Sequence, residues 1–129
     1  TQTAALAFGG MTYPPAVNRG TTDSWDGSSW TTLNSLNTAR RRLAGAGSQT
    51  LAVAFGGGDA PPQTGATETW DGTSWATNPN SMSTARSQLG GKGTYLAALA
   101  FGGSTPSLST ATEEWNGAGT LQTVTIDTD

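Results

Sequence analysis

The side chains in this sequence that could do chemistry are carboxylates, arginines and tryptophans, because the chain contains neither histidine nor cysteine. Without these two residue types it has no Ser-His-Asp or Cys-His nucleophile pair and no histidine-ligated metal site. The most regular carboxylates are Asp23, Glu68 and Glu113, each two residues before a tryptophan. One acid per repeat lies too far from its copies for the three to chelate one ion. We expect these acids to pair with arginines, and we expect no catalytic residue, no metal and no cofactor.

The arginines and tryptophans each admit two interpretations. Arg40 and Arg86 both close a Thr-Ala-Arg motif and are 46 residues apart. They could bind anions, but the fixed spacing favours a structural role, in which they bond to carbonyls or acids between neighbouring units. The tryptophans could be platforms for stacked sugars, although their positions beside expected turns favour packing. The glycine-rich residues 89–93 lack the spacing of a phosphate-binding loop.

These residues recur because the sequence is a repeat. Phe-Gly-Gly appears three times at offsets of 47 and 46 residues, and three tryptophans follow at intervals of 45. A period in the mid-forties is typical of the blades of a β-propeller. We expect the repeated glycines, tryptophans and arginines to be structural: Gly9, Gly10, Trp25, Trp30, Arg40, Gly56, Gly57, Trp70, Trp75, Arg86, Gly102, Gly103 and Trp115.

Each complete repeat predicts four antiparallel strands. The run that ends in Phe-Gly-Gly alternates large and small apolar residues, which indicates a strand buried on both faces. The glycine-rich run before it, residues 43–47 or 89–93, suits a crowded inner strand that another backbone approaches closely. An Asp-Gly or Asn-Gly pair follows each apolar run and indicates a type I′ turn between the third and fourth strands. In the third copy Thr120 stands where the second tryptophan is expected, so we expect a weaker hairpin there.

The sequence therefore predicts an all-β fold with about 2.75 propeller blades and about 11 strands. The first blade covers residues 1–36 and lacks its inner strand. The second and third blades cover residues 37–78 and 79–124, and residues 125–129 form a tail without a repeat partner.

The repeat resembles the kelch repeat, a four-stranded propeller blade of similar length. The matching features are the glycine pair after an apolar strand, the paired aromatics downstream and the arginine that opens the next unit. The resemblance covers residues 4 to about 120. Two features depart from it: the first aromatic is tryptophan rather than tyrosine, and its spacing of five to the second is short. The form TARxxLAGAG…LAFGG…TExWDGxSW is similar to Thr/Ser/Ala-rich kelch-like repeats in predicted phage and environmental viral proteins.

That resemblance implies a structural or attachment role and a virion-associated or extracellular location. It supplies no catalytic residue, and the copper chemistry of kelch-like oxidases requires histidine and cysteine, which this chain lacks. The net charge of −3 argues against nucleic acid as a partner. The longest apolar run, residues 95–101, is far too short to cross a membrane.

Two functions from different classes remain. The first is a non-enzymatic structural or recognition module, and the second is a lectin-like propeller that binds glycans through its variable loops. In either case we expect a protein or glycan ligand to meet the loop end, where Tyr13, Arg19 and Asp59 are not repeated. We also expect the chain to bind itself, because about 2.75 blades cannot close a ring. A head-to-tail homodimer would supply close to six blades, which suits closure better than the roughly nine of a trimer.

Overall fold

The computed structural model describes residues 1–58, 62–117 and 121–124. These residues form strands and turns and contain no helix, so the prediction of an all-β fold is confirmed. The thirteen strands are β1 (Ala5–Phe8), β2 (Met11–Thr12), β3 (Val17–Asn18), β4 (Thr22–Trp25), β5 (Trp30–Leu33), β6 (Ala44–Gly47), β7 (Ala52–Phe55), β8 (Thr67–Trp70), β9 (Trp75–Asn78), β10 (Gly90–Gly93), β11 (Ala98–Phe101), β12 (Thr112–Trp115) and β13 (Leu121–Val124).

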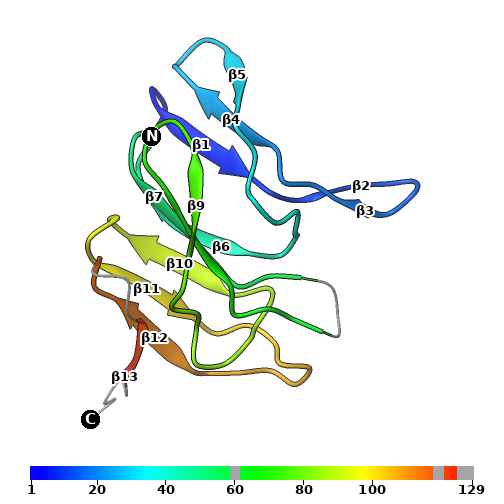
Figure 1. Ribbon diagram of the computed structural model, residues 1–129, viewed down its shortest axis with the longest axis vertical. Coiled ribbons are helices and arrows are strands. Elements are labelled where there is room, and N and C mark those ends of the chain that lie inside the picture. The colour runs from blue at the N-terminus through cyan, green and yellow to red at the C-terminus, as the bar shows by residue number, and fades with distance from the viewer. Residues whose placement is uncertain (59–61, 118–120, 125–129) are drawn as a thin grey trace.

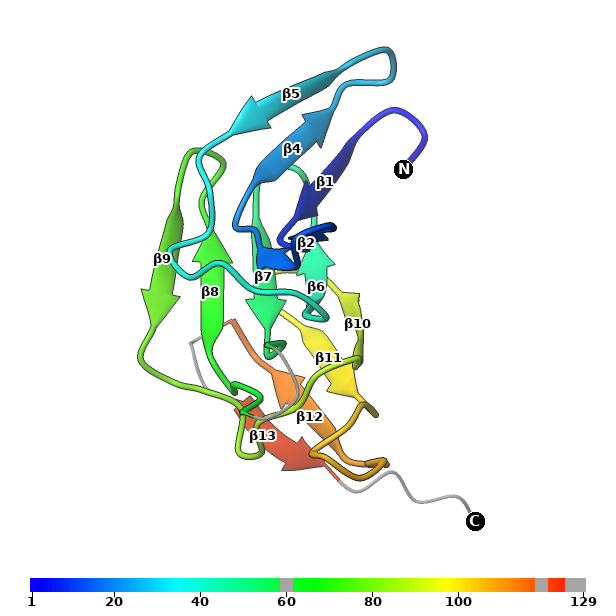
Figure 2. The same ribbon diagram turned by 90° about the vertical axis from the view of Figure 1, so that its right-hand side faces the viewer.

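The strands form three main antiparallel sheets and one small hairpin. The first sheet has the order β1-β4-β5, the second β6-β7-β8-β9 and the third β10-β11-β12-β13. The three sheets follow one another along the long axis of the molecule (Figure 1). Figure 2 shows β6 and β10 on one side of the molecule and β9 on the opposite side. The hairpin of β2 and β3 extends away from the first sheet and lies in a segment where the sequence predicted a loop.

The strand registers show that the three sheets repeat one pattern. Ala52 pairs with Trp70 at one end of the β7–β8 ladder, and Ala98 with Trp115 at the same place in the third sheet. Ala5 and Trp25 occupy this place in the first sheet. The first sheet has no counterpart of β6 and β10 among the described residues, so β1 is an edge strand.

The core lies between the sheets rather than within any one of them. Leu6 and Phe8 of β1 pack against the cluster that contains Ala52 and Ala54 of β7. On the other face of β7, Val53 and Phe55 pack against a cluster from the third sheet: Ala98, Ala100 and Trp115. The large residues of each sheet therefore cover the alanines of the next, and β7 is buried on both faces.

The inner strands β6 and β10 are rich in glycine because their backbones approach closely. A Cβ atom at Gly91 would lie 2.8 Å from the carbonyl oxygen of Gly45. A Cβ atom at Gly45 would lie 2.4 Å from the ring of Phe8. At Gly91 the close atom belongs to the backbone, so glycine is required for the observed spacing of β6 and β10. At Gly45 a side chain would have to displace the end of the Phe8 ring.

The Asp-Gly pairs predicted type I′ turns in the β4–β5 and β8–β9 hairpins, and this prediction is wrong. Trp25 pairs with Trp30, which leaves four residues in the loop instead of two. Gly27 has a φ of 100°, whereas Asp26 is not among the residues with positive φ. The Asp26 carboxylate accepts hydrogen bonds from the amides of Ser28 and Ser29, both 2.8 Å long. The aspartate is thus selected for its side-chain acceptor rather than for a left-handed backbone.

The third hairpin differs from the expectation as well. The residue opposite Trp115 is Leu121, because this loop is one residue longer than the other two. Four residue pairs join β12 to β13, the same number as in the other two hairpins. Thr120, which was expected opposite Trp115, lies outside the described residues.

Candidate functional site

The outer face of the third sheet carries exposed large apolar residues. Leu99 and Phe101 are 39% and 42% exposed. Their counterparts in the second sheet, Val53 and Phe55, are both fully buried because the third sheet covers them. We call Leu99 and Phe101 the large-residue face.

The opposite end of the molecule carries the complementary surface. Ala7 is exposed and Trp25 is half-buried on the first sheet. Their counterparts in the second sheet, Ala54 and Trp70, are 0% and 1% exposed because Leu6 and Phe8 cover them. We call Ala5, Ala7 and Trp25 the alanine face. The two ends thus present the two halves of a contact that occurs twice inside the molecule.

A tryptophan reaches from the second sheet to the first. Trp75 is buried, lies 4.8 Å from Phe8 in an edge-on arrangement, and donates a 2.9 Å hydrogen bond to the hydroxyl of Thr22. Trp30, at the same position in the first sheet, is 56% exposed. The third sheet has no tryptophan at this register position, and the hydroxyl of Thr67 is correspondingly buried without a hydrogen-bond partner.

Two buried arginine–carboxylate pairs stand between the sheets, as the spacing of these residues predicted. Nη2 of Arg86 lies 2.6 Å from Oε2 of Glu113, and Nη1 donates to the carbonyls of Gly102 and Ala111. Nη2 of Arg40 lies 3.2 Å from Oε1 of Glu68 without the alignment of a hydrogen bond, and Nη1 donates to the carbonyl of Ala66.

Burial governs the electrostatics of the pair formed by Arg40 and Glu68. Loss of hydration lowers the pKa of the Arg40 guanidinium from its ordinary value, and the Glu68 carboxylate opposes this effect. Both arginines are at most 1% exposed. Their surroundings are those of structural ion pairs rather than of an anion-binding surface.

The third carboxylate of the series, Asp23, has different neighbours. It is half-buried, and its Oδ1 accepts a 2.7 Å hydrogen bond from the hydroxyl of Thr32. No salt bridge to an arginine is found for it among the described residues, so the expected pairing fails at this position.

Sequence reasoning missed the apolar anchors of the connectors between sheets. Leu36 and Met82 are 6% and 5% exposed, and their amides donate to the carbonyls of Gly20 and Gly65. Both precede the arginine of the Thr-Ala-Arg motif by four residues. This repeated spacing, in Asn-Ser-Leu and Asn-Ser-Met, is the signal that could have identified them.

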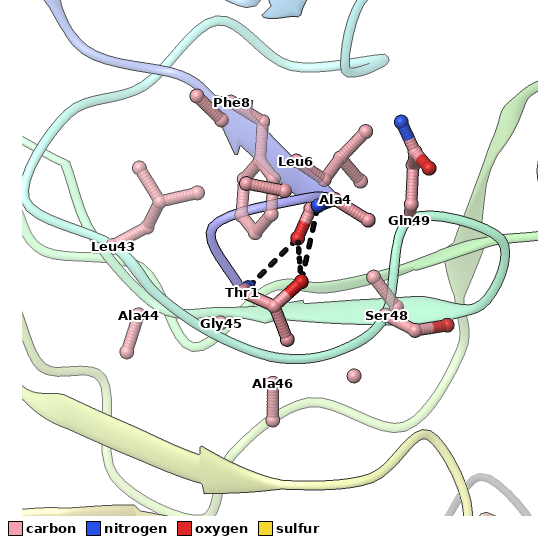
Figure 3. Close-up of a pocket in the computed structure, with 14 residues that line it drawn as sticks. Thr1, Ala4, Leu6, Phe8, Leu43, Ala44, Gly45, Ala46, Ser48 and Gln49 are labelled. Carbon is pink, nitrogen blue, oxygen red and sulfur yellow. Dashed lines mark hydrogen bonds between the residues drawn. The ribbon is translucent and has the colours of Figure 1, made fainter. Parts of the chain in front are cut away.

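A pocket of about 550 Å³ lies between the open edge of β1 and strand β6. Residues 4–8 line it on one side and residues 43–49 on the other, and Thr1 and Ala52 also contribute to the lining. Figure 3 shows the ring of Phe8 directed from β1 toward Gly45. The lining is made almost entirely of small and apolar residues.

The loop residues expected to meet a ligand are only partly brought together. Tyr13 is 79% exposed at the β2–β3 hairpin, and Arg19 follows that hairpin and is exposed. The carbonyl of Arg19 accepts a hydrogen bond from the amide of Arg40, so the hairpin and the connector share one end of the molecule. Asp59 lies outside the described residues.

Comparison with known protein families and with curated proteins found no match to this chain. Within the described residues, no group of three or more acidic side chains is placed to hold a metal ion. The same part of the chain has no helix that is long and apolar enough to span a membrane.

Proposed function

We propose that this chain is a non-enzymatic structural module made of three kelch-like propeller blades, which assembles head to tail with a second copy into a closed ring. The observation that carries the proposal is the match between the two ends of the molecule. The large-residue face is the repeat equivalent of Val53 and Phe55, and the alanine face is the repeat equivalent of Ala98 and Ala100, which pack against each other inside the chain. Exposed apolar surface of this kind drives association.

Further support comes from Trp30 at the same end as the alanine face. By analogy with Trp75, which covers Phe8 and donates to Thr22, Trp30 would cover Phe101 and reach Thr112 of the second copy. Aromatic side chains of this size contribute much of the energy at protein interfaces. Two copies bring six main sheets, a number within the usual range for closed propellers.

The structural role fits the residues that repeat. Arg40 and Arg86 form buried ion pairs, and the repeated tryptophans at 70, 75 and 115 are buried in the core. The role also fits the absence from the sequence of histidine and cysteine.

One substitution at each end tests the proposal. Phe101→Asp places a charge on the large-residue face, and Ala7→Lys places one on the alanine face. We expect each variant alone to lose assembly, measured by sedimentation, while its circular dichroism stays unchanged. Tyr13→Asp places the same charge at another exposed aromatic position, on the β2–β3 hairpin away from both faces, and this control is expected to assemble normally.

Mixing the two variants reveals the direction of the contact. A head-to-tail interface predicts that the mixture forms two-chain species, because one unmodified seam remains between a Phe101→Asp chain and an Ala7→Lys chain. Normal assembly of Phe101→Asp on its own would overturn the proposal.

A further inference from the structure

We propose that Asn116-Gly117 is a site of spontaneous deamidation in the folded protein, where the asparagine is converted into aspartate and isoaspartate. The backbone amide nitrogen of Gly117 attacks the side-chain carbonyl carbon of Asn116, and a cyclic imide forms as ammonia leaves with the amide proton. Water then opens the imide at either of its carbonyls. Together the two steps turn an amide and water into a carboxylate and ammonium. This chemistry is separate from the proposed assembly and requires no second copy.

The sequence directs the reaction to a single asparagine. Of the six asparagines in the chain, Asn116 alone precedes a glycine. A side chain on the following residue hinders the attack of that residue's amide, and glycine has none. Asn78 precedes a proline, whose nitrogen carries no proton to lose. Asn116 is therefore the asparagine with the least hindered nucleophile beside it.

The structure leaves both reacting groups accessible. The β12–β13 ladder ends at the pair of Trp115 and Leu121, so Asn116 and Gly117 lie outside it. Asn116 is exposed to solvent, and Gly117 is half-buried. Among the described residues, the amide of Gly117 has no hydrogen-bond acceptor. This amide is free to lose its proton to hydroxide, which is the step that makes it a nucleophile.

The equivalent positions in the other two hairpins already carry the aspartate that deamidation produces. Asp26 and Asp71 also precede a glycine, and each carboxylate accepts two 2.8 Å hydrogen bonds from amides of its loop. These amides lower the pKa of both carboxyls, so the aspartates are ionised at neutral pH. An ionised carboxylate is a poor electrophile, which protects these two positions from the same cyclisation. The neutral amide of Asn116 has no such protection.

The fold requires the glycine that makes this pair reactive. Gly117 has a φ of 71°, a left-handed conformation that favours glycine. A Cβ atom there would lie 2.8 Å from Cα of Leu96, in the turn between β10 and β11. A larger residue at position 117 would slow the reaction, but this backbone contact excludes one. The reactive pair therefore persists for as long as asparagine precedes the glycine.

The test is incubation of the folded 129-residue chain at mildly alkaline pH, followed by proteolysis and mass spectrometry of the peptides. We expect Asn116 to convert into both aspartate and isoaspartate, and an acidic band to appear on isoelectric focusing. The rate should rise with pH, because the attacking amide must lose its proton. Asn34 and Asn37 should stay unmodified, since their side-chain amides donate to the carbonyls of Thr73 and Trp75 and neither precedes a glycine.

Two controls make the outcome decisive. Asn116→Gln keeps a neutral amide at the position but requires a larger ring, so the acidic band should be lost. A synthetic peptide of residues 112–123 gives the time scale of the unhindered reaction, and circular dichroism verifies that the incubated chain stays folded. Conversion of the folded chain on that time scale, with isoaspartate among the products, would support the site.

Three results would overturn the proposed site. The first is a folded chain that keeps its amide after the peptide has fully converted. The second is formation of aspartate without isoaspartate, which would indicate direct hydrolysis of the side chain rather than an imide. The third is an acidic band that persists in Asn116→Gln.

Discussion

At the scale of single residues, the molecule depends on charged side chains buried where two sheets and a connector meet. The guanidinium of Arg86 is removed from water, contacts the Glu113 carboxylate at 2.6 Å and donates to two backbone carbonyls. Such a pair contributes little compared with an apolar pair of the same size, but breaking it leaves one buried charge without compensation.

We therefore expect Arg86→Ala to lower the free energy of unfolding by about 3–5 kcal/mol. Arg42→Ala is the control, because Arg42 is exposed, and its effect should stay within about 0.5 kcal/mol. Urea denaturation measures both. Similar losses for the two variants would show that Arg86 behaves as a surface residue.

The sequence predicted these arginine–carboxylate pairs because arginine, acid and tryptophan keep one spacing in each repeat. The same reasoning predicted an arginine partner for Asp23, and this prediction is wrong. The partner of each acid comes from the connector that packs beside it, so the position of the acid in the repeat does not determine its partner. Leu36 and Met82 escaped notice because a single apolar residue within a polar connector gives no strand or helix periodicity, which leaves only its repeated spacing to the arginine as a signal.

At the scale of elements, the tight loops after β4 and β8 each contain a glycine and an aspartate whose carboxylate accepts hydrogen bonds from the amides of the loop. The amides of Ser29 and Ser28 hold the pKa of the Asp26 carboxyl well below its ordinary value. The amides of Ser74 and Thr73 lower the pKa of Asp71 in the same way. Both hairpins therefore favour the ionised form of the aspartate.

This preference gives a dependence of stability on pH with a definite sign. A carboxyl whose pKa is lowered by folding stabilises the protein at any pH above its pKa in the unfolded chain, about 3.9. This stabilisation is lost as the pH falls toward the pKa of the carboxyl in the folded chain. We expect the double variant Asp26→Asn, Asp71→Asn to lose less thermal stability between about pH 4 and pH 2 than the unmodified chain. Thermal melts across this range provide the measurement, and parallel curves for the two proteins would contradict the assignment.

The loops also show why strand pairing was easier to predict than turn geometry. Alternating large and small residues specify the faces of β7 without any knowledge of its neighbours, and both faces are buried as expected. An Asp-Gly pair, in contrast, predicted a two-residue loop but lies in a four-residue loop in both hairpins. The length of the loop is set by the pairing of Trp25 with Trp30, which depends on the register of the sheet rather than on the residues of the turn.

At the scale of the whole molecule, three stacked sheets leave two unlike ends. The large-residue face, Leu99 and Phe101, is exposed at one end, and the alanine face, Ala5, Ala7 and Trp25, is uncovered at the other. The same pair of surfaces is closed twice inside the chain. The repeat alone predicted this polarity, because each unit presents its large residues in one direction and its alanines in the other.

We propose that two copies close this arrangement, and native mass spectrometry of the 129-residue chain measures whether they do. The proposed ring predicts a dominant species of two chains, each of 13.1 kDa, that persists on dilution into the low micromolar range. A stable, folded species of one chain under the same conditions would contradict it.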